Sequence, residues 1–99
     1  MSIITATPTN SNVSVGNTTT TVIAGSSGRQ MVMLSNDSDE VIYLAVGADA
    51  VLNKGIRLNA NGGSVTFEAN SLIGPVLTKT INAICTSGTK TLCIFEVTV

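Results

Sequence analysis

The chain has 99 residues, of which 43% are hydrophobic and only 11% are charged, with a formal net charge of −1. This length fits one domain with a real core, and the apolar content excludes disorder. Without a basic run, and with few aromatic residues, the chain offers no basis for nucleic-acid binding. It contains no histidine, the usual general base and commonest zinc ligand, so we predict neither an enzyme nor a cofactor or metal site.

Residues 1–10 have neither the basic start nor the apolar run of a signal peptide, and no stretch is long enough to span a membrane. We therefore expect a protein that is made and kept in the cytoplasm of the cell that expresses it and that does not bind membranes. Ser, Thr and Asn replace the missing charges, and these groups cost less to desolvate than charges do. Such a surface is typical of a protein that is covered by neighbouring subunits in an assembly.

Residues 1–10 are predicted to form an extended polar arm that carries Ile3 and Ile4, with Pro8 blocking regular continuation. Residues 11–99 are predicted to form a single domain. Short β-branched runs recur there, separated by Gly, Asn, Asp and Ser, as in an all-β fold. Strands are predicted at residues 12–15, 18–24, 30–36, 41–47, 56–60, 64–69, 80–87 and 91–99.

Short strands with turns at this spacing predict an antiparallel β-sandwich or a small barrel. The apolar run at residues 30–36 is typical of a strand that is covered on both faces. Residues 56–69 and residues 80–99 are each predicted to form a hairpin. Strand alternation in these hairpins points Glu68 and Glu96 outward.

Lys54 and Arg57 lie beside glycines, which raises the possibility of a phosphate-binding loop. That site needs Gly-x-x-x-x-Gly-Lys-Ser/Thr, or Gly-x-Gly-x-x-Gly between a strand and a helix, and neither pattern is present. The segment instead predicts a tight turn in which Gly55 takes a conformation that other residues avoid. Lys54 and Arg57 then face solvent or a partner subunit.

Asp37, Asp39 and Glu40 could supply oxygen ligands to calcium, but the twelve-residue EF-hand pattern is absent. A polar turn whose side chains bond their own backbone fits the same residues and is favoured. Cys85 and Cys93 flank the last predicted turn and could form a disulfide across the hairpin, or lie on opposite faces if the register slips by one. Because we expect cytoplasmic synthesis, free buried thiols are favoured.

Several motifs resemble those of small structural proteins of tailed bacteriophages, a group that includes head-decoration (cement) and head-fibre proteins. In that group an apolar strand ending in Asn precedes a polar turn and a Tyr-Leu strand ending in Gly. A Gly-Ile-x-Leu stretch, a glycine pair and an Ile-x-Ala-Ile-Cys strand follow. The matching residues here are Val32, Leu34, Asn36, Ile42, Tyr43, Leu44, Gly47, Val51, Gly55, Ile56, Leu58, Gly62, Gly63, Ile81, Ala83, Ile84 and Cys85.

The resemblance spans about residues 28–97 and implies a β-domain of a virion. We expect a capsid decoration protein on the capsid surface that binds the major capsid protein or other virion proteins. The alternative is a fibre, neck or tail module that binds a receptor or a carbohydrate. A homo-oligomer is expected, with a trimer favoured. The candidate partner contacts are Ile3, Ile4, Pro8, Lys54 and Arg57.

Overall fold

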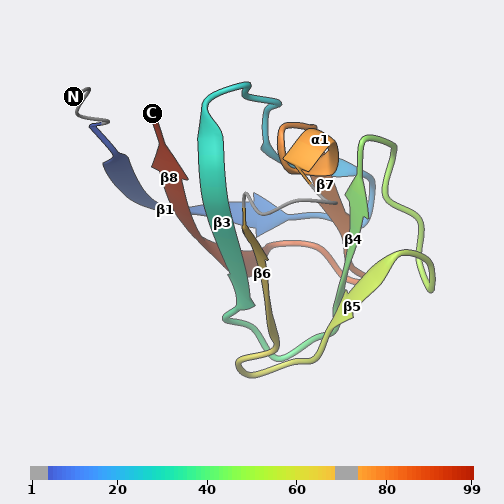
Figure 1. Cartoon of the computed structure of the whole chain (residues 1–99). Helices are drawn as coiled ribbons and strands as arrows, with labels where there is room; N and C mark the ends of the chain where they lie inside the picture. Colours follow the sequence, from blue (N-terminus) through green and yellow to red (C-terminus); the bar gives the residue numbers. More distant parts are fainter. Residues whose placement is uncertain (1–4, 69–73) are drawn as a thin grey trace.

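The structure is a computed structural model, and it describes residues 5–68 and 74–99. These residues form eight strands and one helical turn, α1 (Gly74–Leu77), in two antiparallel sheets (Figure 1). The first sheet contains, in spatial order, β1 (Thr7–Val15), β8 (Lys90–Thr98), β3 (Arg29–Asn36) and β6 (Ser64–Glu68). The second sheet contains β2 (Thr20–Ile23), β7 (Ile81–Ile84), β4 (Ile42–Val46) and β5 (Ile56–Leu58). No helix of the described residues is long and apolar enough to cross a membrane.

Consecutive strands lie in opposite sheets at every step except from β4 to β5. Two four-stranded antiparallel sheets connected in this way form a jelly roll, so the predicted all-β sandwich is confirmed. The two predicted hairpins are wrong, because β5 pairs with β4 while β6 pairs with β3, and β7 and β8 also lie in different sheets. A tight turn between two alternating strands has the same sequence pattern whether the second strand pairs beside the first or crosses to the facing sheet.

The core lies between the sheets and is built from alternate residues of each strand. In the first sheet Leu34 and Leu92 are fully buried, and Ile94 is 6% exposed. From the second sheet the core takes Ile42, Leu44, Leu58, Ile81 and Ala83. The prediction that residues 30–36 are covered on both faces is wrong for the single chain, since Met33 on the other face of β3 is 39% exposed.

One end of the sandwich is closed by a buried ion pair that the sequence did not reveal. The fully buried Arg29 side chain donates from Nε to Glu96 Oε2 at 2.9 Å. Its other guanidinium nitrogens donate to the carbonyl oxygens of Ala24, Leu77 and Lys79. The guanidinium therefore holds β3, β8 and the loops around α1 together. Glu96 points into this end rather than outward, so its predicted orientation is wrong, whereas Glu68 is exposed as predicted.

The structure does not confirm the extended N-terminal arm. Strand β1 begins at Thr7 and pairs with β8 along its whole length, from Thr7 opposite Thr98 to Val15 opposite Lys90. Pro8 is therefore a strand residue opposite Val97, at the outer edge of the first sheet, where the lack of an N–H is tolerated. Ile3 and Ile4 lie outside the described residues.

Candidate assembly surface

The first sheet has a second face, which points away from the core and which we call the outer face. Its members alternate along each strand with the buried residues and are fixed by the strand registers. They are Pro8, Asn10, Asn12 and Ser14 of β1; Thr91, Cys93, Phe95 and Val97 of β8; Met31, Met33 and Ser35 of β3; and Ser64, Thr66 and Glu68 of β6.

The outer face carries two neighbouring rows of side chains that cross all four strands. The register aligns Asn10, Phe95, Met33 and Thr66, which we call the Phe95 row. The next row toward the other end of the strands, the Cys93 row, contains Asn12, Cys93, Ser35 and Ser64. On the two central strands the Phe95 row is built from large apolar side chains and the Cys93 row from small ones. The face is therefore stepped rather than flat.

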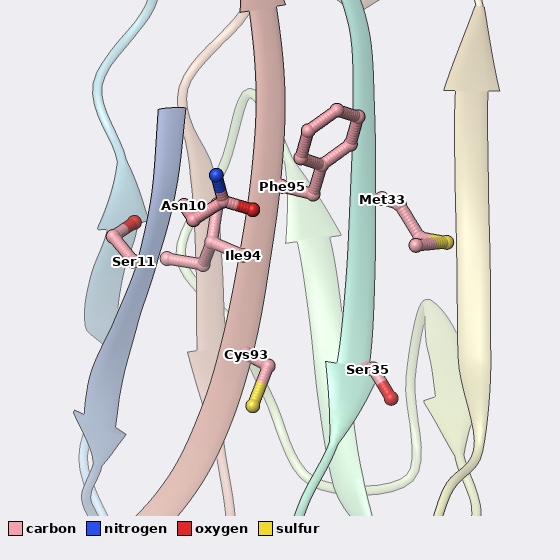
Figure 2. Close-up of a pocket in the computed structure, with 7 residues that line it drawn as sticks. All are labelled: Asn10, Ser11, Met33, Ser35, Cys93, Ile94 and Phe95. Carbon is pink, nitrogen blue, oxygen red and sulfur yellow. The ribbon is translucent and has the colours of Figure 1, made fainter. Parts of the chain in front are cut away.

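A hollow of about 260 Å³ follows this step. Figure 2 shows Phe95 and Met33 at one level along the strands and Cys93 and Ser35 at the next. Asn10, Ser11 and Ile94 complete the lining. The hollow thus lies beside the large residues of the Phe95 row and above the small residues of the Cys93 row.

The outer face is almost free of charge. Glu68, on the edge strand β6, is the one charged residue among its members. On β3 and β8 most outer-face positions hold Met, Cys, Phe or Val, and these side chains are half-buried except for exposed Met33, whereas a solvated strand face carries polar residues at such positions. A face with apolar side chains at its centre and uncharged polar ones at its edges resembles the core and rim of a protein interface.

Among the predicted contact residues that the structure describes, Pro8 alone belongs to the outer face. Lys54 lies in the exposed turn between β4 and β5, and Arg57 lies on β5 opposite Tyr43, so neither is part of the first sheet. The predicted turn at Gly55 is confirmed, with a φ of +82° and no room for a Cβ beside the Leu44 carbonyl oxygen. The structure thus does not bring the two cations together with Pro8.

The two cysteines are free, as the sequence analysis favoured, and the possible disulfide across a hairpin is not formed because Cys85 follows β7 in the second sheet while Cys93 lies on β8 in the first. Cys85, which follows β7, is fully buried, and its Sγ donates to the Val15 carbonyl oxygen at 3.4 Å. Cys93 is half-buried on the outer face. Burial is therefore confirmed for Cys85 and only partial for Cys93.

The residues at 37–40 form the predicted polar turn between β3 and β4. Buried Asn36 anchors it by donating from Nδ2 to the carbonyl oxygens of Glu40 and Leu58, at 2.7 and 3.1 Å. The Ser87 hydroxyl and backbone N–H donate to the Glu40 carboxylate at 2.6 and 2.7 Å, and these bonds lower its pKa. Lys90 donates to Asp39 at 2.7 Å, which lowers the pKa of Asp39 and raises that of Lys90. The described residues contain no group of acidic or cysteine side chains placed to hold a metal.

Sequence reasoning did not select the residues that form the outer face's centre. Met31 and Met33 on β3, and Cys93, Phe95 and Val97 on β8, recur at every second position, and all but Val97 are next to a buried residue. That double apolar pattern was the available signal, and it led to the prediction of a strand covered on both faces. Within the described residues, the second sheet covers one face of β3, and the other face stays partly exposed.

No protein-family profile matches the chain, and no curated protein matches it by sequence. Among solved structures it is similar to a chain of the Bacillus endospore appendages, which are described as a novel family of disulfide-linked pili. The two superpose with a TM-score of 0.54 at 10% sequence identity, over 96% of this chain and 87% of the other. At this identity the similarity establishes the β-sandwich fold alone.

Proposed function

We propose that this protein is a non-enzymatic structural subunit of a larger particle, and specifically a cement protein that decorates a bacteriophage capsid. The observation that carries the proposal is the nearly uncharged outer face with Met33 and Phe95 near its centre. Burial of such side chains against a neighbour lowers the free energy, because it removes apolar surface from water. A face that the chain leaves open on its own is then covered in the particle.

The fold and the sequence motifs support the same class of function. Jelly rolls are common in viral capsid and lectin domains, although a fold by itself does not fix a function. The structural neighbour forms pili, which are also protein assemblies. The resemblance of the motifs to phage head proteins narrows the proposal to a virion component that contacts the major capsid protein or other virion proteins.

A cement protein of this kind acts through binding alone. Because it binds assembled subunits and not dissociated ones, it stabilises the shell by mass action against heat or internal DNA pressure. The segment before β1 is a second proposed contact, because an extended segment can add a strand to a neighbour's sheet edge. Ile3 and Ile4 belong to that segment.

Co-sedimentation with shells tests the proposal. Particles that lack this protein are mixed with the purified chain, pelleted, and heated to measure the temperature of DNA release. We expect binding and a higher release temperature. Removing residues 2–6 leaves β1 intact and should weaken binding if the segment contributes. A chain that stays in the supernatant with every particle component would overturn the proposed function.

The hollow on the outer face favours carbohydrate binding as a second candidate function. It places the Phe95 ring near the polar side chains of Asn10 and Ser35. Its volume of about 260 Å³ is below the usual range for ligand pockets, which starts at about 300 Å³, so this candidate ranks second. Specific binding to one sugar class on a glycan array, without binding to shells, would favour it over the cement role.

A further inference from the structure

We propose that the outer face of the first sheet binds the same face of a second copy of this chain around a two-fold axis. The axis runs across the strands between the Phe95 row and the Cys93 row, level with Ile94. This deepens the proposed function by naming the partner of the outer face, and it rests on that function only for the claim that the face is covered.

The step on the outer face makes it complementary in shape to itself. Rotation by 180° about this axis places the Phe95 row of each copy over the Cys93 row of the other, strand over corresponding strand. Phe95 then enters the hollow above the partner's Cys93, and Met33 lies over the partner's Ser35. Residue i meets residue j and j meets i, as a two-fold interface requires. Large side chains fill the space above small ones in both directions at once.

The chemistry of the facing residues also matches. A sulfur atom beside an aromatic ring is a favourable contact, and the Phe95 ring over a Cys93 thiol supplies one in each half of the interface. On the edge strands β1 and β6 the same rotation brings Asn10 toward the partner's Asn12, and Thr66 toward the partner's Ser64. Amide and hydroxyl groups can pair with one another there, while the apolar residues meet along the central strands.

Charge and area are compatible with a second copy as the occupant. When a face binds a copy of itself, its charges meet charges of the same sign and repel. The outer face carries one charge, Glu68 on the edge strand β6, so this repulsion is small. Four strands about 4.8 Å apart, with an average length of about 25 Å, cover roughly 480 Å² on each copy. Both copies together bury about 1,000 Å², which is below the roughly 1,200 Å² at which stable specific interfaces begin and within the class of weak, transient ones. We therefore expect a reversible dimer rather than a permanent one.

A two-fold axis along the strands gives a poorer fit. It places the Phe95 row over the partner's Phe95 row, large side chain on large side chain, and leaves both hollows unfilled. If this axis runs along β8, it also places Cys93 over the partner's Cys93. The axis across the strands offsets these two thiols, so no disulfide is expected between the copies.

Sedimentation velocity of the full chain over a range of concentrations tests the dimer. We expect a monomer and dimer equilibrium that Thr66→Lys weakens at least about tenfold, equivalent to about 1.4 kcal/mol, because it brings a charge into the interface. Thr21→Lys is the matched control, since Thr21 is equally an exposed strand residue but lies in the second sheet. It should leave the dimer unchanged.

Three results would overturn the inference: a monomer at all concentrations, a trimer as the only oligomer, or equal effects of the two Lys variants. Failure of this test alone leaves the proposed function intact if the monomer still sediments with shells. If the protein neither self-associates nor sediments with shells, the outer face is not an assembly surface.

The reactivity of Cys93 tests the orientation of the two copies. We expect its alkylation to slow as the dimer forms, while buried Cys85 stays unreactive at every concentration. Thr66→Lys should remove the protection of Cys93. Rapid oxidation to a dimer linked through Cys93, lost in Cys93→Ser, would show that the thiols face each other and would contradict the axis across the strands.

Discussion

The two faces of the first sheet differ although they are built from the same strands. On the face toward the core, Leu34 and Leu92 have no exposed surface, and Arg29 is satisfied by Glu96 and three carbonyl oxygens. On the outer face the adjacent residues Met33 and Cys93 are apolar as well, yet no part of the chain that the structure describes covers them completely. Similar residue types thus serve folding on one face and remain available for association on the other.

This difference teaches that apolar composition in a strand does not distinguish a core position from an interface position. Substitutions on the core face should therefore lower stability, whereas those on the outer face should lower association at nearly constant stability.

The largest effect is expected for Arg29→Leu at the core face. The change leaves Glu96 without its cation and three carbonyl oxygens without a donor, so we expect a loss of about 3–5 kcal/mol in the free energy of unfolding. Urea denaturation followed by circular dichroism measures it. Gln30→Leu, at the exposed neighbouring position, is the control. Equal stability of the two variants would show that the buried ion pair does not hold this end of the sandwich.

Leu34→Ala and Met33→Ala compare the two faces at adjacent positions of one strand. Leu34 is fully buried, so its truncation should cost about 2–5 kcal/mol of stability. Met33 is 39% exposed, so its truncation should cost less than about 1 kcal/mol and mainly weaken self-association. Denaturant titration and sedimentation velocity are both measured on each variant. A Met33→Ala protein as unstable as Leu34→Ala would mean that the outer face belongs to the core.

Gly55→Ala tests a stability effect far from the outer face, in the turn of the second sheet. The positive φ and the nearby Leu44 carbonyl oxygen both disfavour a Cβ, so we expect a loss of about 1–3 kcal/mol. Self-association of the folded fraction should not change. Thermal denaturation with sedimentation at a temperature where the variant is folded measures both quantities. An unchanged melting temperature would show that the turn adapts to a side chain.

The smallest effect is expected from pH. Hydrogen bonds from Ser87 and Lys90 lower the pKa values of Glu40 and Asp39 from 4.5 and 3.8, so their contribution to stability is present above those values. It is lost as pH falls through the lowered folded-state pKa values. The melting temperature should therefore decline in acid, with a shallower decline in Glu40→Gln. A variant with the same acid profile as the parent would show that the Glu40 contact with Ser87 contributes nothing.

The sequence was sufficient for the β class, the polar turn after Asn36 and the glycine turn at Gly55, because these depend on local propensity and backbone conformation. It was not sufficient for the sheet partners of β5 through β8. The alternation of apolar and polar residues along two successive strands is the same whether they form a hairpin or lie in opposite sheets. Glu96 was placed outward for a related reason. Its position on the core side is explained by Arg29, which is 67 residues away in the chain.

The outer face was visible in the sequence only as excess apolar character. The run at residues 30–36 predicted coverage on both sides, and the fold shows which side the chain leaves open. Residues on β1, β3, β6 and β8 meet in one face through pairing between distant segments, so no local motif marks them.

Peroxide oxidation of the Met33 thioether, followed by peptide mass spectrometry, measures whether the outer face is covered when the protein assembles. The sulfur should oxidise quickly in dilute protein, where the side chain is 39% exposed, and several-fold more slowly in concentrated protein or on shells. Thr66→Lys should abolish the dependence on concentration. An oxidation rate of Met33 that is the same in the dilute and the assembled protein would contradict the assignment of this face to assembly.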